Sequence, residues 1–145
     1  MSEYKTIKER EKEITDEFSF FDSWEEKYEY IIDLGKRLEP LDEKFKVEEN
    51  IIKGCQSTVW LTSDFKNGKV FYKADSDAII VKGLVSMLIK VLSGNKPDEI
   101  LEAKLNFIKD IGMMTHLAQT RSNGLLAMVK QIKNYALAYK SADVA

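Results

Sequence analysis

Cys55 is the residue best suited to covalent chemistry, because it is the only cysteine in the 145-residue chain. It lies in the polar segment of residues 53–57, directly ahead of a β-branched, apolar run that begins at Thr58. Gly54 tolerates backbone angles that other residues avoid, so a loop is predicted here. A cysteine in a loop is a nucleophile when positive charge, hydrogen bonds or a helix N-terminus stabilise its thiolate. A free cysteine is also often a buried, unreactive hydrophobe, and the residue pattern alone leaves both interpretations open.

Three cations are candidate neighbours of this thiol: Lys53, His116 and Arg121. His116 is the only histidine, and it is either a proton-transferring group or a packing residue with satisfied ring nitrogens. Arg121 precedes a predicted helix, where the helix dipole disfavours a cation. We therefore expect Arg121 either to form a buried ion pair or to contact an anionic group.

Asp75 and Asp77 are two carboxylates separated by one residue, and they allow two interpretations. They could form an acid/base pair. They could equally be N-caps of the helix that is predicted to follow, and capping is the more economical explanation because side chains two apart need not converge.

The sequence lacks several common functional signatures. It contains no P-loop, no dinucleotide-binding glycine motif and no HExxH. With one histidine and one cysteine, neither a transition-metal site nor a bound cofactor is expected. A single cysteine fits a reducing cytoplasm.

Charge and hydropathy also limit the partners. The net charge of −2 shows no excess of basic residues of the kind that binds nucleic acid. No secretory signal is visible, and the apolar run of residues 78–92 is too short to span a membrane. Residues 1–50 contain 16 acidic and 9 basic residues, whereas residues 51–145 contain 8 and 13. This asymmetry either steers a protein partner or reflects solvated helix faces.

The clearest structural signal is a β-hairpin. Asn67-Gly68 favours a type I′ turn, because both residues tolerate positive φ. Pairing outward from this turn places three residue pairs on one mostly apolar face: Phe65 with Val70, Ser63 with Tyr72, and Leu61 with Ala74.

Helical patterns flank the hairpin on both sides. A charged helix at 6–17 starts with capping-box residues Thr6 and Glu9, and a firmer helix follows at 24–38. Residues 78–92 are apolar nearly all round and predict a buried central helix, and Pro97 opens a short one. The last helix carries one apolar stripe from Leu125 to Tyr139 and would be capped by Thr120 or Ser122.

These elements predict an α+β fold: a single domain of residues 1–145 with a small antiparallel sheet packed against N-terminal and C-terminal helices. Residues 1–20 are expected to form a peripheral N-terminal helical extension.

Beyond these patterns, five blocks of sequence occur in an order that resembles the SufE family. They cover the chain from about Trp24 to the last helix. The blocks are WEEKY with its following II and LG (24–35), GCQS with VW (54–60), DSDA with IVKGL (75–84), HL (116–117), and RSNGL with AM (121–128). One departure is visible at 118–120, where relatives often carry a proline-containing stretch.

The resemblance implies a sulfur-acceptor protein of iron–sulfur cluster assembly. Cys55 matches the family's acceptor cysteine, which takes persulfide sulfur from a cysteine desulfurase and stimulates that enzyme. Asp75, Asp77, Arg121 and His116 match recurring polar positions and are expected to support it. The implied partners are a SufS-like cysteine desulfurase, which holds the pyridoxal phosphate, and a SufBCD-like scaffold. The chain itself would carry no cofactor, would lie in the cytoplasm as a monomer or weak homodimer, and would bind neither nucleic acid nor membrane.

Two other functions remain open at this stage. One is a freestanding cysteine-nucleophile hydrolase or transferase that uses Cys55 with His116 and Asp77, although no local signature of such enzymes is present. The other is an adaptor in which Cys55 is incidental.

Overall fold

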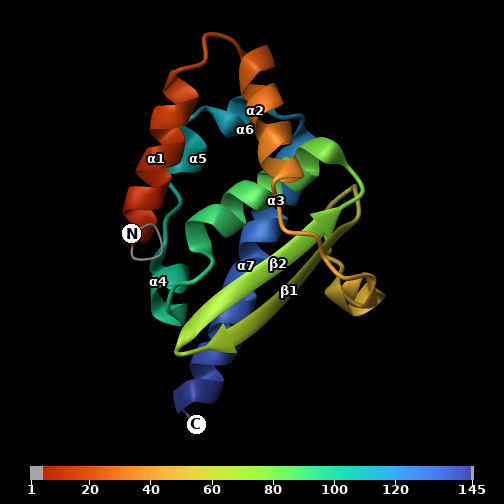
Figure 1. Cartoon of the computed structure of the whole chain (residues 1–145), viewed down its shortest axis with the longest axis vertical. Coiled ribbons are helices and arrows are strands. Elements are labelled where there is room, and N and C mark those ends of the chain that lie inside the picture. Colours follow the sequence, from red (N-terminus) through yellow and green to blue (C-terminus); the bar gives the residue numbers. More distant parts are fainter. Residues whose placement is uncertain (1–4, 145) are drawn as a thin grey trace.

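The computed structural model describes residues 5–144 and confirms the α+β fold (Figure 1). Two strands form one antiparallel sheet, and helices from both ends of the chain pack around it. The elements in chain order are α1 (Ile7–Ser19), α2 (Trp24–Lys36), η2 (Glu43–Phe45), η3 (Glu48–Asn50), β1 (Val59–Lys66), β2 (Lys69–Ser76), α3 (Ile79–Leu92), α4 (Pro97–Glu102), α5 (Phe107–Asp110), α6 (Met113–His116) and α7 (Gln119–Val144).

The hairpin has the predicted register. Asn67 and Gly68 both have positive φ, at 53° and 76°, as a type I′ turn requires. All three predicted pairs are present, including Leu61 opposite Ala74. The hairpin's inner face is buried, and its members are Val59, Leu61, Val70, Tyr72 and Ala74. The alternation of apolar and polar residues therefore fixed the register as expected.

Helix α7 lies behind the hairpin and is tied to it by tyrosine hydroxyls (Figure 1). The Tyr72 hydroxyl donates to the Ile132 carbonyl at 2.7 Å, and the Tyr135 hydroxyl donates to the Leu61 carbonyl at 3.2 Å. The predicted stripe is correct: Leu125, Met128, Ile132 and Ala136 are all buried. These contacts make the hairpin and α7 one packed unit.

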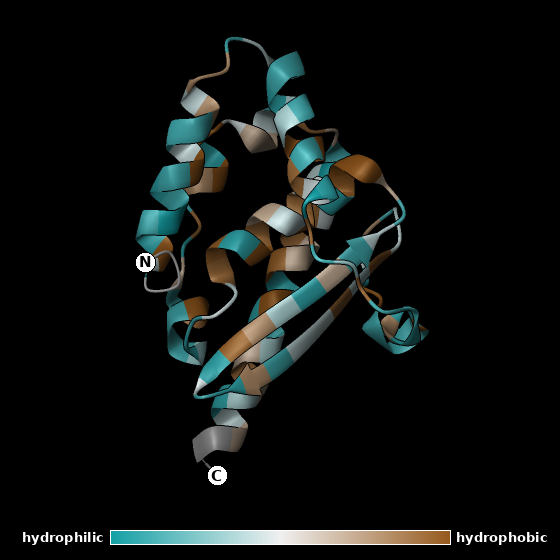
Figure 2. Cartoon of the chain, in the orientation of Figure 1, coloured by the Kyte–Doolittle hydropathy of each residue, from teal (hydrophilic) through white to brown (hydrophobic). Residues whose placement is uncertain are grey.

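Helix α3 is the buried centre, as its composition predicted. Figure 2 shows it brown over much of its length, with the more hydrophilic α1 and α2 beside it. Its closest contact is with α2, where Gly35 faces Gly83 without any intervening side chain. A Cβ atom at Gly83 would lie only 2.1 Å from the Ile31 carbonyl oxygen. The two backbones therefore pack directly together, which only glycine permits.

Helix α1 has the predicted capping box, with the Glu9 N–H donating to Thr6 Oγ1 and the Thr6 N–H to Glu9 Oε1. Residues 1–20 were expected to be a peripheral extension, of which residues 1–4 lie outside the described part. Ile14 and Phe18 of α1 are nevertheless buried within the same core as α3. Arg10 also donates to the Ser93 carbonyl at 2.6 Å, at the end of α3.

Two capping predictions are wrong. Helix α3 begins after Ala78, which makes no side-chain cap, so neither Asp75 nor Asp77 caps it. Helix α7 begins at Gln119, upstream of both Thr120 and Ser122. The Ala118 carbonyl accepts the first N–H bonds of that helix, and Ser122 is buried inside it. At the start of α3, the Asp77 carboxylate accepts from the Thr58 N–H instead of capping the helix.

Replacing Gly83 with alanine tests the close contact between α2 and α3. The added Cβ would collide with backbone, so the free energy of unfolding should fall by about 3 kcal/mol or more. Urea unfolding followed by circular dichroism measures this change. Gly124→Ala is the matched control, because its Cβ would meet the nearest atom at an ordinary 3.6 Å. Equal destabilisation of the two variants would contradict the close packing.

Candidate functional site

The Cys55 loop is anchored firmly at its base. The Ile52 N–H donates to the Val59 carbonyl at 2.9 Å, which closes the loop against the start of β1. At the other side, the Thr58 N–H donates to Asp77 Oδ1 at 3.2 Å, and the Asp77 N–H donates back to the Thr58 carbonyl at 3.3 Å. The hairpin thus holds both ends of residues 53–58.

The tip of the loop is held more weakly, against α7. Gly54 has a φ of +93°, and a side chain there would be crowded by Ala127, with Cβ atoms 3.3 Å apart. The half-buried Cys55 donates its S–H to the Gly124 carbonyl over a long 3.6 Å. A thiol is a weak donor, so this contact orients the sulfur without fixing the loop.

The sulfur opens into a cavity of about 240 Å³ between the loop, α3 and the start of α7. Arg121 alone is charged among the described residues that line it, and neither a carboxylate nor an imidazole is present there. The lining residues are Cys55, Gln56, Ser57, Val81, Ala118, Thr120, Arg121, Gly124 and Met128. This pocket joins two residues singled out from the sequence, Cys55 and Arg121.

Burial raises the pKa of the Cys55 thiol above its ordinary value. The carbonyl of Gly124 favours the same form, because it can accept a bond from S–H but repels a thiolate. In this conformation Cys55 is therefore a protonated, weakly reactive thiol.

Arg121 does not form the buried ion pair considered from the sequence. It is exposed in the first turn of α7, and no ion pair to it occurs within residues 5–144. The remaining alternative, contact with an anionic group, is compatible with its place at the pocket.

His116 lies outside this pocket. Its ring is stacked on Trp24, with centroids 4.0 Å apart and planes 16° from parallel. Its Nδ1 donates to the Gly112 carbonyl at 3.0 Å. In this structure the imidazole is thus an exposed ring that stacks on Trp24 and is bonded through Nδ1, and it does not lie beside Cys55 as a base.

Asp75 sits in a small ionic network at the end of β2. Its carboxylate lies 3.0 Å from the Lys46 ammonium and 3.2 Å from that of Lys82. Partial burial works against ionisation, but hydrogen bonds from Lys46, the Ser76 N–H and Lys82 outweigh it and lower the pKa of Asp75. Asp77 is exposed and bonded to Thr58, so the two carboxylates serve separate contacts and do not form an acid/base pair.

Gly124, the direct neighbour of the sulfur, and Trp24 and Tyr28, the partners of His116, were not predicted from the sequence. Each joins residues far apart in the chain, and no local pattern signals such a pair. Lys53, proposed as a helper, is exposed and lines a different cavity beside η3.

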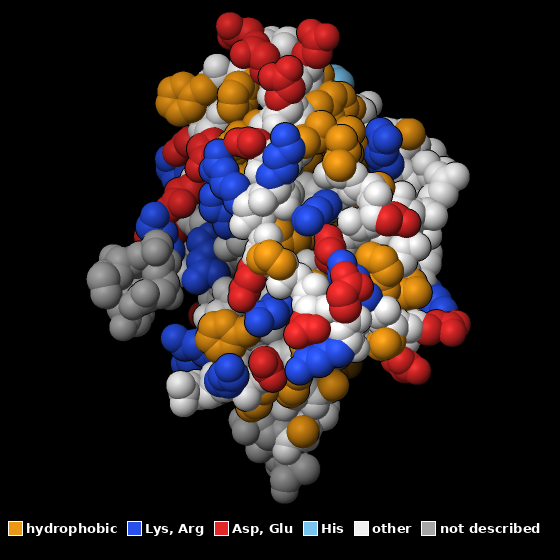
Figure 3. Space-filling view, turned by 45° about the vertical axis from the view of Figure 1, so that its right-hand side comes forward, with side chains coloured by type: hydrophobic (Ala, Val, Ile, Leu, Met, Phe, Trp, Pro, Cys, Tyr) orange, Lys and Arg blue, Asp and Glu red, His pale blue; other side chains and the backbone are white. Residues whose placement is uncertain are grey.

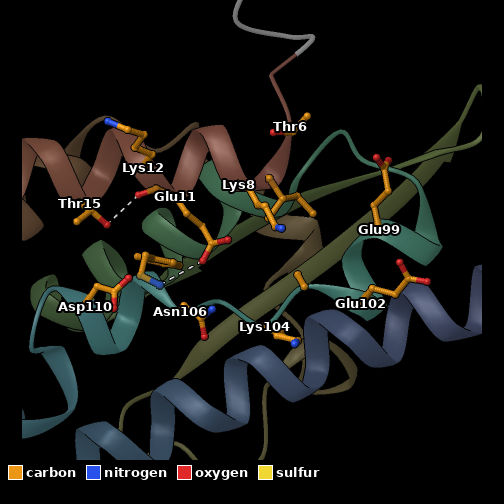
Figure 4. Close-up of a pocket in the computed structure, with 13 residues that line it drawn as sticks. Thr6, Lys8, Glu11, Lys12, Thr15, Glu99, Glu102, Lys104, Asn106 and Asp110 are labelled. Carbon is orange, nitrogen blue, oxygen red and sulfur yellow. Dashed lines mark hydrogen bonds between the residues drawn. The ribbon is translucent and has the colours of Figure 1, made fainter.

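A cavity of about 790 Å³, larger than the Cys55 pocket, is remote from Cys55 and lies between α1 and the α4–α5 segment (Figure 4). Glu11 reaches across it and accepts from the Phe107 N–H at 3.2 Å. Its walls carry charges of both signs and hold neither cysteine nor histidine: Lys8, Lys12, Lys104, Glu99, Glu102 and Asp110. Size alone does not make this cavity a reactive site, and the candidate nucleophile Cys55 lines the other pocket.

Within residues 5–144, no three His, Cys, Asp or Glu side chains converge as metal ligands. The helices found there are all too short or too polar to cross a bilayer.

Figure 3 shows acidic side chains gathered at the top of the molecule, while acidic and basic side chains mix over the rest of that face. Exposed acids at the start of α2 include Glu25, Glu26 and Glu29.

The fold and the pocket together define a class: a small α+β domain that presents one loop cysteine to a cavity at the start of its C-terminal helix. Residues 12–136 match the family model SufE, described as an Fe-S metabolism associated domain. The chain belongs to the SufE family, and this membership assigns it a role in iron–sulfur metabolism.

Individual relatives agree with this assignment. An uncharacterized SufE-like protein of Rhizobium meliloti is 39% identical over 129 residues, which cover 86% of this chain and 92% of the relative. Another from Synechocystis is 41% identical, covering 79% and 72% of the two chains. The chloroplastic/mitochondrial SufE-like protein 1 of Arabidopsis thaliana is 43% identical over 77% of this chain, but that region is 30% of the plant protein.

A solved structure supports the fold. The solution structure of a hypothetical protein from Thermus thermophilus superimposes with a TM-score of 0.76, covering 91% of this chain and 96% of the other. At 19% identity, this likeness bears on the fold alone.

The raised pKa of Cys55 predicts how its reactivity depends on pH. Alkylation by iodoacetamide should be slower in the folded protein than in urea, because less thiolate is present at neutral pH. The midpoint of the rate against pH should lie above the ordinary thiol value of about 8.5 when the protein is folded, and return to it in urea. A folded-state midpoint at or below the unfolded one would contradict the buried, protonated thiol.

The Asp75 network predicts a pH-dependent contribution to stability. Because the folded-state pKa is lowered, the contribution is complete above the unfolded pKa of about 3.9 and is lost as pH falls through the folded value. Asp75→Asn should lower the free energy of unfolding by about 1–2 kcal/mol at pH 7, with the difference from wild type shrinking in acid. Asp64→Asn, which removes a surface pair with Lys66 at 4.0 Å, is the control and should change little. A loss that is independent of pH would contradict an electrostatic role.

Proposed function

We propose that this protein is a sulfur acceptor that takes persulfide sulfur from a cysteine desulfurase onto Cys55 and delivers it for iron–sulfur cluster assembly. The observation that carries the proposal is the half-buried Cys55 thiol on a loop that is anchored at its base and lightly held at its tip. Membership of the SufE family supplies the metabolic context.

The transfer step follows from thiol–disulfide chemistry. The Cys55 thiolate attacks the terminal sulfur of a persulfide on the desulfurase. The sulfur–sulfur bond of that persulfide breaks, the desulfurase cysteine leaves as a thiolate, and a new sulfur–sulfur bond forms on Cys55. The terminal sulfur keeps its oxidation state, so the step needs no external oxidant or reductant.

A carrier cysteine must be protected while it holds sulfur and accessible while it transfers it. Movement of the Cys55 loop would meet both requirements. A persulfide is easily lost to reductants, so the pocket between the loop and α7 would protect the loaded state. Transfer requires the sulfur to reach another protein. The base contacts at Ile52 and Thr58 can stay in place while the tip turns outward, because at the sulfur it gives up only the weak S–H contact to Gly124.

Arg121 supports the anionic form of the acceptor. A persulfide in the pocket would lie near Arg121 and the first turn of α7, where the helix dipole favours negative charge. This gives Arg121 a function at a position that is otherwise unfavourable for a cation. Asp77 contributes differently, by tying the end of the loop to the hairpin.

A freestanding cysteine hydrolase is less well supported. Such an enzyme needs a base within hydrogen-bond reach of the nucleophile. His116 is bonded to Gly112 and stacked on Trp24, Asp77 is bonded to Thr58, and neither lines the Cys55 pocket. We therefore favour a covalent carrier over an independent enzyme.

The proposed partners follow from the carrier role. The pyridoxal phosphate would belong to the SufS-like desulfurase, and the recipient of the sulfur would be a SufBCD-like scaffold. A reducing compartment such as the cytoplasm would suit the thiol.

Intact-mass spectrometry after incubation with cysteine and a SufS-like desulfurase tests the proposal. The wild-type protein should gain the mass of one or more sulfur atoms, and the gain should disappear on treatment with a reductant. Cys55→Ala should gain none, whereas Ser57→Ala, a neighbour in the same loop, is the comparison for changes that spare the thiol. A wild-type protein that remains unmodified while the desulfurase turns over would end the sulfur-acceptor proposal.

A further inference from the structure

One group of contacts connects α2 with the segment that forms the pocket wall. The Trp24 ring, at the start of α2, stacks on His116 at the end of α6. One turn later in α2, the Tyr28 hydroxyl donates to the backbone carbonyl of His116. Lys27 adds a cation over the Trp24 ring, 4.8 Å from its centroid. His116 is thus held to α2 through both its ring and its backbone.

His116 is held from the other side as well. Its Nδ1 donates to the carbonyl of Gly112, a residue in the left-handed conformation with φ +75°. Thr115 donates its hydroxyl to the same carbonyl at 3.0 Å. The short helix α6 is therefore closed onto a fixed turn, although four residues of helix would not be stable alone.

The pocket wall begins two residues after His116. Leu117 is buried, and Ala118 both lines the pocket and accepts the first N–H bonds of α7, from Arg121 at 2.9 Å and Ser122 at 3.0 Å. Gly124, whose carbonyl receives the Cys55 S–H, follows in the next turn. A displacement of His116 would therefore reach the atoms around the sulfur through a short connection that is anchored by the buried Leu117.

We propose that Trp24, Tyr28 and His116 are positioning residues that hold the α6–α7 wall of the Cys55 pocket against the thiol. They act through residues 117–124 and do not touch the sulfur. This inference rests on the proposed function in taking Cys55 as the reactive group. It assigns the single histidine a role in geometry instead of proton transfer.

The pH profile of Cys55 alkylation distinguishes positioning from general structural support. In Tyr28→Phe and His116→Ala the wall should loosen, admitting water to the thiol and weakening its contact with Gly124. The alkylation rate at neutral pH should rise by about threefold or more, and the profile should move toward lower pH. Among the described residues that line the Cys55 pocket, Arg121 is the charged one, and both variants retain it.

Two variants provide matched controls. Tyr30→Phe removes a hydroxyl from the same helix that has no hydrogen-bond partner among the described residues, so it should leave the profile unchanged. Ser86→Ala removes a hydroxyl-to-carbonyl bond of 3.0 Å between α3 and Leu34 of α2, away from the pocket. It should lower the urea midpoint without moving the profile.

The alkylation profiles of the two variants decide between the possible roles of His116. Profiles of Tyr28→Phe and His116→Ala that coincide with wild type would overturn the proposal, as would a loss of alkylation confined to His116→Ala, which would indicate a base. If His116→Ala fails to fold, Tyr28→Phe decides alone, since it removes a single oxygen atom. The assay uses no desulfurase. A shifted profile in a protein that never accepts sulfur would therefore refute the proposed function while leaving the positioning role intact.

Discussion

The site depends on one contact, the thiol of Cys55 against the carbonyl of Gly124 in the second turn of α7. A carbonyl stabilises S–H and opposes a thiolate, and burial acts in the same direction. A few residues earlier, the same helix presents its N-terminus and Arg121, which favour an anion. The sulfur thus rests at a boundary between an environment that keeps it protonated and one that stabilises negative charge. Small changes in the position of the loop would decide which of these two environments the sulfur meets.

The rest of the fold keeps that boundary in place. Tyrosine hydroxyls tie the hairpin to α7, and the hairpin in turn anchors both ends of the Cys55 loop through Val59 and Asp77. On the other side, α3 packs backbone to backbone on α2, and α2 holds His116. Two routes of contact, one through the sheet and one through the helices, therefore meet at residues 117–128. A loop whose surroundings are this well fixed can move at its tip without loosening the domain.

Sequence reasoning succeeded where the signal was local and periodic. Asn67-Gly68 specified the turn, and the alternation on either side of it specified the register. The stripe from Leu125 to Tyr139 predicted the buried face of α7. The apolar composition of 78–92 predicted the central helix.

Prediction from the sequence failed where a side chain could bond either a local or a distant partner. Asp77 would have been a sound N-cap, but it bonds to Thr58 instead. The stacking of His116 on Trp24 spans most of the chain, and no spacing rule describes such a pair. Family resemblance, and not periodicity, pointed to Cys55 as the reactive residue, and the structure then supplied its neighbours.

A raised thiol pKa is compatible with sulfur transfer and helps to explain how a carrier would hold its cargo. Nucleophilicity of a thiolate increases with its pKa, with a Brønsted slope of about 0.4–0.5, so Cys55 loses thiolate population but gains intrinsic reactivity in what remains. The same property makes it a poor leaving group. A thiol that attacks the terminal sulfur of a loaded Cys55 must expel the Cys55 thiolate, and the carbonyl of Gly124 disfavours that anion within the pocket. Release would therefore be slow while the loop is docked. It would become faster if the sulfur turned into solvent and the pKa of Cys55 returned to its ordinary value. On this argument the pocket would control sulfur delivery through the stability of the leaving thiolate as well as by excluding reductants.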